Sequence, residues 1–171
     1  MKVIFLDRDG VINRDIGYLY KIDDFEFIDG IFDSCKYFQA IDYKLIVVTN
    51  QSGIARGYYS EEAFNTVTEW MLEQFRGQGI DILDVFFCPH GEKSTCRCRK
   101  PRPGMLLEAQ DKYGINMETS WMIGDKETDV SAANSAGITN TILLKNSINN
   151  ETDSEGKIIL NSISDSYKFI K

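Results

Sequence analysis

Hydrophobic and polar positions alternate in blocks along the chain, and the blocks differ in their period. Short runs that are almost wholly apolar are separated by longer segments in which apolar residues recur every three or four positions. The uniform runs are typical of strands buried on both faces, and the longer period is typical of amphipathic helices. The pattern therefore predicts an α/β fold, a doubly wound parallel sheet with helices on both faces.

The predicted strands and helices follow one another in alternation. The strands are expected at residues 2–6, 44–48, 82–87, 121–123 and 141–144. Helices are expected at 30–41 with Asp29 as N-cap, from Ser60 as N-cap through Phe75, at 103–114, at 130–136 and at 163–170. Pro103 suits a first helical turn, and Gly114 suits a helix end. The polar segment 146–156 is expected to be a mobile loop.

Length and composition favour one domain over residues 1–171. The chain has 171 residues, of which 43% are hydrophobic, enough for a single core. No run approaches the roughly 20 apolar residues of a membrane span, and no secretory leader is recognisable, so we expect a cytoplasmic protein. The net charge of −7 argues against nucleic acids and anionic membranes as partners. Nothing in the pattern indicates more than a monomer.

The first apolar run ends abruptly in two carboxylates, Asp7 and Asp9. In extended backbone, residues two positions apart point to the same side, so these side chains are expected to converge. Carboxylates that close repel each other unless a cation lies between them or one is protonated. A phosphoryl-transfer site meets both conditions. An ordinary strand-end turn is the alternative interpretation, because Asp and Gly are common in turns.

Polar residues follow other predicted strands too, and parallel sheets bind ligands at the carboxyl ends of their strands. Hydrolysis of a phosphate monoester needs a nucleophile, a magnesium ion and an acid for the leaving oxygen. Asp7 can supply the nucleophile and Asp9 the acid and base, while Asp125 completes an oxygen-rich site suited to Mg²⁺. Thr49 and Lys100 can stabilise the phosphoryl oxygens. Each residue alone has an ordinary structural explanation; their shared location favours function.

Three cysteines and the only histidine lie within eleven residues. Cys88, His90, Cys96 and Cys98 supply three thiolates and an imidazole, a complete tetrahedral set for zinc. A filled set has no position for a catalytic water, so the expected zinc is structural. Free thiols or a redox dithiol are the alternatives, and the spacing of the pairs disfavours the latter. The segment runs directly into the basic residues 97–102.

Four segments resemble the ordered motifs of the haloacid dehalogenase-like (HAD) phosphatases. They are Asp7-Arg8-Asp9-Gly10-Val11-Ile12, Val48-Thr49-Asn50, Arg99-Lys100-Pro101 and Gly124-Asp125-Lys126-Glu127-Thr128-Asp129. The cysteine and histidine segment is similar to that of the zinc-containing group, which holds heptose-bisphosphate and histidinol-phosphate phosphatases. Segments 15–18, 25–30 and 49–57 favour the heptose enzymes. The resemblance implies a HAD-like Rossmannoid core without a separate cap domain, because no large insertion is present.

The resemblance also implies roles for single residues. Asp7 would be the nucleophile, Asp9 the acid and base, and Mg²⁺ would be held by the Asp7 and Asp125 carboxylates and the Asp9 backbone carbonyl. Asp129 would orient Lys126. The implied substrate-binding residues are Asp15, Ile16, Gly17, Tyr18, Thr49, Asn50, Gln51, Ser52, Arg99, Lys100 and Lys126. The segment between His90 and Cys96 is shorter than in many heptose-bisphosphate phosphatases, which bears on substrate discrimination.

Two other functions are compatible with part of the sequence. A histidinol-phosphate phosphatase would share the motifs and the zinc, but its substrate carries an ammonium and an imidazole, whereas this chain offers a basic rim. A receiver-type signalling domain also combines acidic residues with Thr and Lys on a doubly wound sheet. Asp9 and the zinc set would have no role there.

Overall fold

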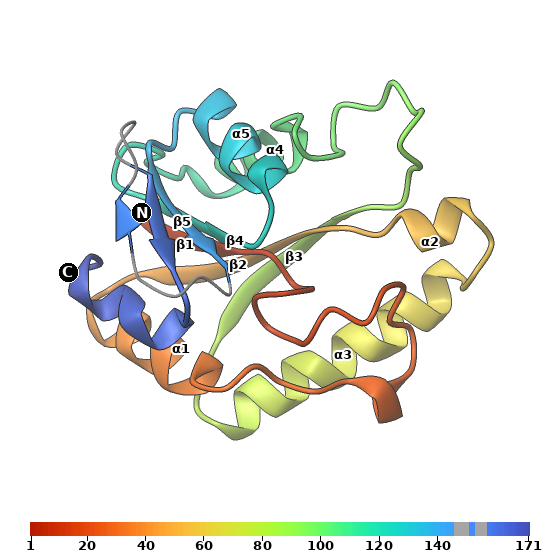
Figure 1. Ribbon diagram of the computed structural model, residues 1–171, viewed down its shortest axis with the longest axis horizontal. Coiled ribbons are helices and arrows are strands. Elements are labelled where there is room, and N and C mark those ends of the chain that lie inside the picture. Colours follow the sequence, from red (N-terminus) through yellow and green to blue (C-terminus); the bar gives the residue numbers. More distant parts are fainter. Residues whose placement is uncertain (146–150, 153–156) are drawn as a thin grey trace.

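A single seven-stranded sheet forms the centre of the protein (Figure 1). We describe a computed structural model of the chain, covering residues 1–145, 151–152 and 157–171. In these residues the strand order is β3-β2-β1-β4-β5-β7-β6, with all neighbours parallel except β6, which is antiparallel to β7. The strands are β1 (Val3–Leu6), β2 (Lys44–Asn50), β3 (Ile82–Cys88), β4 (Trp121–Gly124), β5 (Asn140–Leu144), β6 (Glu151–Thr152) and β7 (Ile158–Leu160).

Helices cover both faces of the sheet, which confirms the predicted doubly wound fold. In Figure 1, α1 (Ile31–Ala40) and α3 (Glu61–Gly77) lie below the sheet, and α4 (Gly104–Tyr113) and α5 (Glu127–Ser135) lie above it. The short helix α2 (Ser52–Ala55) follows β2. Two 3₁₀ helices complete the described elements, η1 (Ile22–Asp24) and η2 (Ile163–Lys168). No helix of the described chain is both long and apolar enough to cross a membrane.

Strand β1 shows why the strand sequences are uniformly apolar. Ile4 and Leu6 pack into the core beneath the sheet, and Val3 and Phe5 pack into the core above it. All four side chains are fully buried. Because β1 pairs with both β2 and β4, its carboxyl end lies where the strand order reverses. This is the position at which open α/β sheets bind ligands.

The element boundaries differ from the predicted ones at functionally relevant places. Strand β2 continues through Thr49 and Asn50, and β3 continues to Cys88, so these residues end the strands rather than follow them. Helix α5 begins at Glu127, three residues before the predicted helix. Strand β7 was not predicted, although its residues Ile158–Leu160 form an apolar run as short as the one that predicted the strand at 121–123. The terminal segment forms the 3₁₀ helix η2.

The helix caps test the predictions in detail. Ser60 caps α3 as predicted, because its hydroxyl accepts a hydrogen bond from the Ala63 N–H at 3.1 Å. Pro103 and Gly114 flank α4 as predicted. The prediction for Asp29 is wrong: Gly30 occupies the N-cap of α1 in a left-handed conformation (φ 82°), which glycine adopts without strain.

Only part of the polar segment 146–156 can be compared with its prediction as a mobile loop. Residues 146–150 and 153–156 lie outside the described residues. Between them, Glu151 and Thr152 form β6, which pairs with Ile159 and Ile158 of β7. At least this part of the segment has regular structure.

Candidate active site

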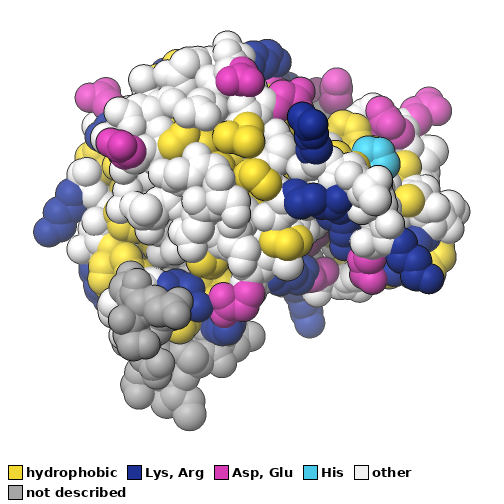
Figure 2. All heavy atoms as spheres, turned by 90° about the horizontal axis from the view of Figure 1, so that it is seen from above, with side chains coloured by type: hydrophobic (Ala, Val, Ile, Leu, Met, Phe, Trp, Pro, Cys, Tyr) yellow, Lys and Arg dark blue, Asp and Glu magenta, His cyan; other side chains and the backbone are white. Residues whose placement is uncertain are grey.

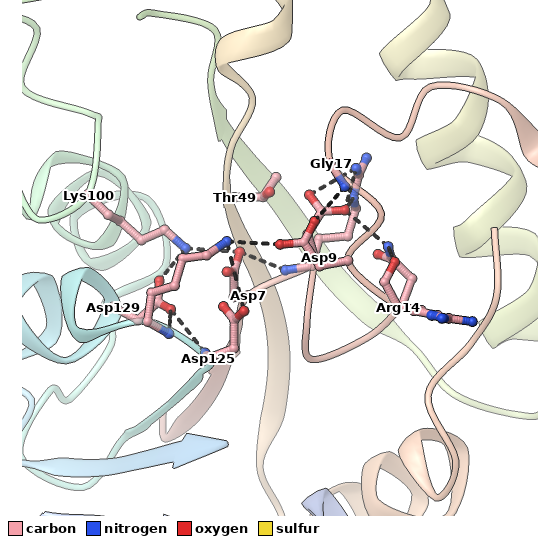
Figure 3. Close-up of polar contacts among 12 residues, drawn as sticks. Asp7, Asp9, Arg14, Gly17, Thr49, Lys100, Asp125 and Asp129 are labelled. Atoms are coloured by element: carbon pink, nitrogen blue, oxygen red, sulfur yellow. Dashed lines mark hydrogen bonds and ion pairs between the residues drawn. The ribbon is translucent and has the colours of Figure 1, made fainter. Parts of the chain in front are cut away.

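Three carboxylates from two chain segments meet at the carboxyl end of the sheet (Figure 3). Asp7 directly follows β1 and continues its pairing, since its N–H donates to the Ile123 carbonyl at 3.0 Å. Asp125 follows β4, and Asp129 lies in the first turn of α5. Oxygen atoms from the three side chains lie within 4.8 Å of one another. The first turn of α5 thus brings Asp129 back beside the end of β4, which Asp125 follows.

Lys100 reaches this cluster from the segment before α4. Its Nζ lies 3.0 Å from Asp7 Oδ1 and 2.7 Å from Asp129 Oδ1, and it donates to the Val48 carbonyl at 2.8 Å. The three N–H groups of the ammonium therefore all have partners. Burial alone would lower the pKa of Lys100, but attraction to Asp7 and Asp129 raises it above its ordinary value. The lysine is a permanent cation in the site.

The role expected for Asp129 needs correction. Its side chain pairs with Lys100, not with the side chain of Lys126. Its second oxygen accepts hydrogen bonds from the backbone N–H groups of Asp125 and Lys126, at 3.2 and 3.0 Å. The side chain of Lys126 instead lies 3.1 Å from Asp15 Oδ2 and 3.8 Å from Asp125 Oδ2. Asp129 therefore orients Lys100 and the backbone at the start of α5.

The crowding of carboxylates strongly affects their ionisation. Burial raises the pKa of Asp7 to about 8; the attraction of Lys100 opposes this rise, and repulsion from Asp129, Asp9 and Asp125 adds to it. Burial also raises the pKa of Asp125 above its ordinary value. Both pKa values rise because several negatively charged carboxylates close together and away from water are unfavourable. A cation bound among these oxygens would remove that cost.

The surroundings of Asp125 fit such a cation. Its Oδ1 is buried and has no hydrogen-bond partner among the described residues. Buried oxygens are rarely left without a partner, and a metal ion is one of the groups that can supply it. Gly10 approaches the same carboxylate so closely that a Cβ at this position would collide with it, and its φ of 89° favours glycine. The donors are all oxygen atoms, which suits Mg²⁺.

Asp9 does not converge with Asp7 in the way that a continued strand would require. The chain turns after Asp7, because the Arg8 carbonyl accepts hydrogen bonds from the N–H groups of Ile12 and Asn13, at 2.8 and 3.1 Å. The Asp9 carboxylate is held instead by the Arg8 guanidinium at 2.8 Å and by the Asn13 amide at 3.0 Å. Figure 3 shows the two carboxylates as separate groups. Their sequence spacing alone could not reveal this turn.

Asp7 and Asp9 both line one cavity of about 410 Å³. Its lining includes most of the predicted substrate-binding residues and three that were not predicted, namely Tyr59, Glu92 and Thr128. The predicted residues in the lining are Asp15, Gly17, Tyr18, Asn50, Gln51, Ser52, Arg99, Lys100 and Lys126. Thr49 is buried directly beside this lining, hydrogen-bonded to Gln51, whereas Ile16 is half exposed and is not part of it.

Asn50 lines the cavity, but its amide is already engaged. The amide nitrogen donates to the Lys100 carbonyl at 3.0 Å, and the amide oxygen accepts from the Lys100 N–H at the same distance. This pair of hydrogen bonds joins the end of β2 to the segment that carries Lys100. Asn50 therefore places Lys100 beside Asp7.

The cavity rim carries charges of both signs. Arg99 donates to the His90 carbonyl at 3.3 Å and lies 3.9 Å from Glu92, which is also 3.6 Å from Arg56. Lys126 pairs with Asp15 on another side of the cavity. On the face shown in Figure 2, Lys and Arg side chains gather beside the single histidine, with acidic side chains nearby. The acidic partners of these cations, Glu92 and Asp15, are themselves exposed or half-exposed. An anionic ligand could therefore replace them as the partner of Arg99 or Lys126.

The predicted zinc ligands come together at the end of β3. Cys88 Sγ lies 3.7 Å from Cys96 Sγ and 3.2 Å from Cys98 Sγ, and His90 Nδ1 lies 3.5 and 3.3 Å from Cys88 and Cys98. With Zn–S bonds of about 2.3 Å, sulfur atoms of a tetrahedral site lie about 3.8 Å apart. The four side chains thus match the size and chemistry of a zinc site.

The comparisons with known proteins agree with this geometry. Residues 97–166 match the HAD-hydrolase-like family. A protein from Yersinia pestis named D-glycero-beta-D-manno-heptose-1,7-bisphosphate 7-phosphatase is 44% identical over 98% of this chain and 94% of its own length. The chain belongs to the heptose-1,7-bisphosphate 7-phosphatase family. It is thus an enzyme, a phosphatase with a HAD-like fold, and not a receiver-type domain.

Two further members show how the family varies. A protein from Campylobacter jejuni named D-glycero-alpha-D-manno-heptose-1,7-bisphosphate 7-phosphatase is 51% identical over 91% of this chain and 86% of its own length. The solved structure of D,D-heptose 1.7-bisphosphate phosphatase from B. bronchiseptica, complexed with magnesium and phosphate, has a TM-score of 0.85 at 29% identity, covering 96% of this chain and 94% of that one. Relatives named for both anomers therefore match this chain over nearly its whole length.

Proposed function

We propose that the protein removes the C7 phosphate of D-glycero-D-manno-heptose 1,7-bisphosphate and leaves heptose 1-phosphate. Relatives at 44% and 51% identity carry the names of such phosphatases. The observation that carries the proposal is the position of Asp7, which lines the cavity with its carboxylate beside Lys100, which in turn pairs with Asp129. The product would enter the synthesis of nucleotide-activated heptose for lipopolysaccharide or other surface glycans.

In the first step, an Asp7 oxygen attacks phosphorus and the bond from phosphorus to the sugar oxygen breaks. Asp9 gives a proton to the leaving oxygen. In the second step, water attacks the phosphorus of the aspartyl-phosphate and passes a proton to Asp9, which restores both side chains. Thr49 accepts a hydrogen bond from Gln51 at 2.9 Å, so its own O–H remains able to donate to the phosphoryl group.

Mg²⁺ would be held by the Asp7 and Asp125 carboxylates and the Asp9 backbone carbonyl. The buried, unpartnered Oδ1 of Asp125 supports this choice among the described residues. Asp129 is a poorer ligand, because Lys100 occupies one of its oxygens and two backbone N–H groups occupy the other. When bound, Mg²⁺ neutralises charge on the phosphoryl oxygens and favours the ionised form of Asp7.

Zinc at Cys88, His90, Cys96 and Cys98 would be structural. The four side chains leave no ligand position for water if the ion is tetrahedral. Arg99 directly follows the last of these ligands, and its guanidinium contacts the carbonyl of His90. The metal would therefore fix the segment from which Arg99 and Lys100 enter the cavity.

Recognition of a bisphosphate would rest on the rim. Arg99 lines the same cavity as Asp7, but its guanidinium contacts His90 and Glu92 rather than the carboxylate cluster. We propose Arg99 as the anchor for the distal phosphate, and Asp15, Gly17, Tyr18 and Ser52 as neighbours of the sugar. We further propose that residues 1–171 act as one domain, and that the enzyme works as a cytoplasmic monomer.

Phosphate release from a panel of substrates tests this function. The α and β anomers of heptose 1,7-bisphosphate are compared with histidinol phosphate in the presence of Mg²⁺, and Asp7→Asn serves as the blank. The proposal requires a heptose bisphosphate to give the highest kcat/KM. A preference for histidinol phosphate would assign the other activity of the zinc-containing group.

A further inference from the structure

Gln51 has no free hydrogen-bond donor to offer a substrate, although it lines the cavity. Its amide nitrogen donates to Asp9 Oδ2 at 3.1 Å and to Thr49 Oγ at 2.9 Å. Its amide oxygen accepts the O–H of Tyr59 at 2.6 Å. The residue is 2% exposed. Gln51 thus links two proposed catalytic residues to a tyrosine that the reaction does not otherwise use.

Tyr59 holds this amide in one orientation. The residue lies between α2 and α3, is buried, and stacks on Tyr20 with ring centres 5.5 Å apart. Burial raises the pKa of Tyr59 to about 12, so the hydroxyl keeps its proton at neutral pH. Because that proton points to the amide oxygen of Gln51, the amide nitrogen must face Asp9 and Thr49.

The consequence for Asp9 follows from the chemistry of its neighbours. Arg8, Asn13 and Gln51 all donate hydrogen bonds to its carboxyl group, at 2.8, 3.0 and 3.1 Å. The Asn13 amide is also fixed, because its nitrogen donates to the Arg14 carbonyl at 2.9 Å. Within the described part of the chain, none of the groups bonded to this carboxyl accepts a proton from it. A proton on Asp9 would therefore point toward the cavity.

We infer that Tyr59 and Gln51 are positioning residues that aim the proton of Asp9 at the leaving oxygen of the substrate. The inference rests on the proposed function and adds a pair of residues to it. In the step concerned, the phosphorus–oxygen bond to the sugar breaks, a bond from phosphorus to Asp7 forms, and the proton moves from Asp9 to the sugar oxygen. If the Gln51 amide rotated, its oxygen would face Asp9 and compete for that proton.

The test compares two leaving groups in Tyr59→Phe and Gln51→Met. A sugar alkoxide needs a proton to leave, whereas p-nitrophenolate leaves without one. We expect kcat/KM for heptose 1,7-bisphosphate to fall at least about tenfold in both variants, because general acid catalysis contributes about 10²–10⁴ in total. For p-nitrophenyl phosphate, kcat/KM should change less than about threefold in Tyr59→Phe. In Gln51→Met, which also loses the hydrogen bond to Thr49, it should fall clearly less than for the bisphosphate. Tyr37→Phe is the matched control, since it removes one tyrosine hydrogen bond, to the Ile170 carbonyl at 2.9 Å, outside the cavity.

A second measurement separates positioning from binding. In the Asp7→Asn background, adding Tyr59→Phe or Gln51→Met should leave the Kd of the bisphosphate unchanged within about twofold, measured by calorimetry. Equal losses of kcat/KM for the two esters, or a weakened Kd, would overturn the inference and restore Gln51 as a substrate contact. If the unaltered enzyme releases phosphate only from p-nitrophenyl phosphate, the proposed substrate fails instead, and an alkyl phosphate that turns over takes its place in the test. Thermal unfolding shows whether a variant has lost its fold. If one of the two variants has, the comparison of the two esters is made with the other.

Discussion

The Nζ atom of Lys100 lies 2.7 Å from Asp129 Oδ1, and both side chains are almost completely buried. Asp7 lies on another side of the same ammonium group, at 3.0 Å. One buried cation thus pairs with two carboxylates that both line the cavity, and Asp7 is the candidate nucleophile. Asp129 keeps Lys100 in place, and its backbone hydrogen bonds join Lys100 to the start of α5.

Removal of this cation should destabilise the fold as well as the reaction. Lys100→Met leaves two buried carboxylates without their partner, a change that typically costs about 3–5 kcal/mol. Urea unfolding of the metal-free protein measures the loss. The double variant Lys100→Met with Asp129→Asn should recover part of it, because one uncompensated charge is removed. A Lys100→Met protein as stable as the parent would contradict the described charge arrangement.

Asp7→Asn should stabilise the metal-free protein in a way that depends on pH. The pKa of Asp7 is raised to about 8 in the folded state, so between about pH 4 and 8 the unfolded chain gives up this proton and the folded protein keeps it. Stability of the parent therefore falls relative to Asp7→Asn as pH rises through this range, and the difference becomes constant above it. We expect the variant to gain at least about 1 kcal/mol by pH 8, or about 2–4 °C in Tm.

Mg²⁺ should make the parent more stable than Asp7→Asn, the reverse of the order expected without metal. An ion that binds only the folded parent adds about 2.7 kcal/mol at a concentration of 100 times its Kd. Asp7→Asn, which lacks a ligand, should gain much less. Thermal unfolding with and without Mg²⁺ at pH 8 provides the comparison. A similar Mg²⁺ response in both proteins would show that Asp7 does not bind the ion.

Loss of the cysteine and histidine cluster should remove one zinc ion per chain. Cys98→Ser takes away a ligand that lies 3.2 Å from Cys88 Sγ, whereas Cys35→Ala changes a buried cysteine outside the cluster. Metal analysis should find zinc in the control and little in Cys98→Ser. The activity of Cys98→Ser should fall because Arg99 and Lys100 follow this segment. Zinc retained at the parental level would show that these side chains do not form the site.

Arg99→Ala should weaken use of the bisphosphate much more than use of a substrate with one phosphate. A charged hydrogen bond typically contributes about 1.5–3 kcal/mol, so we expect KM for the bisphosphate to rise about tenfold to a hundredfold. Hydrolysis of p-nitrophenyl phosphate, which has no second phosphate, should change little. Arg97→Ala is the matched control, because Arg97 is exposed and lies outside the described cavity lining. Equal losses on both substrates would argue against an anchor for the distal phosphate.

The sequence predicted what depends on local pattern. Uniform apolar runs located five of the sheet strands, because both faces of these strands are buried. The side chains at the strand ends then had to meet at one edge of the sheet. Asp7, Asp125 and the zinc ligands could therefore be predicted as site residues. The short strand β7 was missed, although its three residues are also apolar.

What the sequence could not predict is how side chains are paired in space. Asn50 and Gln51 look like substrate contacts in a motif, but the structure uses their amides to hold Lys100 and Asp9. Tyr59 has no motif at all, and its role depends on a hydrogen bond that forms only when the segment after α2 folds back over Gln51. The turn that separates Asp9 from Asp7 likewise follows from backbone hydrogen bonds.

The most direct test of the proposed reaction is to identify which phosphate leaves. The enzyme is incubated with heptose 1,7-bisphosphate and Mg²⁺, and the products are followed by ³¹P NMR with Asp7→Asn as the blank. The proposed reaction yields inorganic phosphate and a single sugar product that keeps the phosphate on C1, with no turnover by Asp7→Asn. Release of the C1 phosphate, or undiminished turnover by Asp7→Asn, would contradict it.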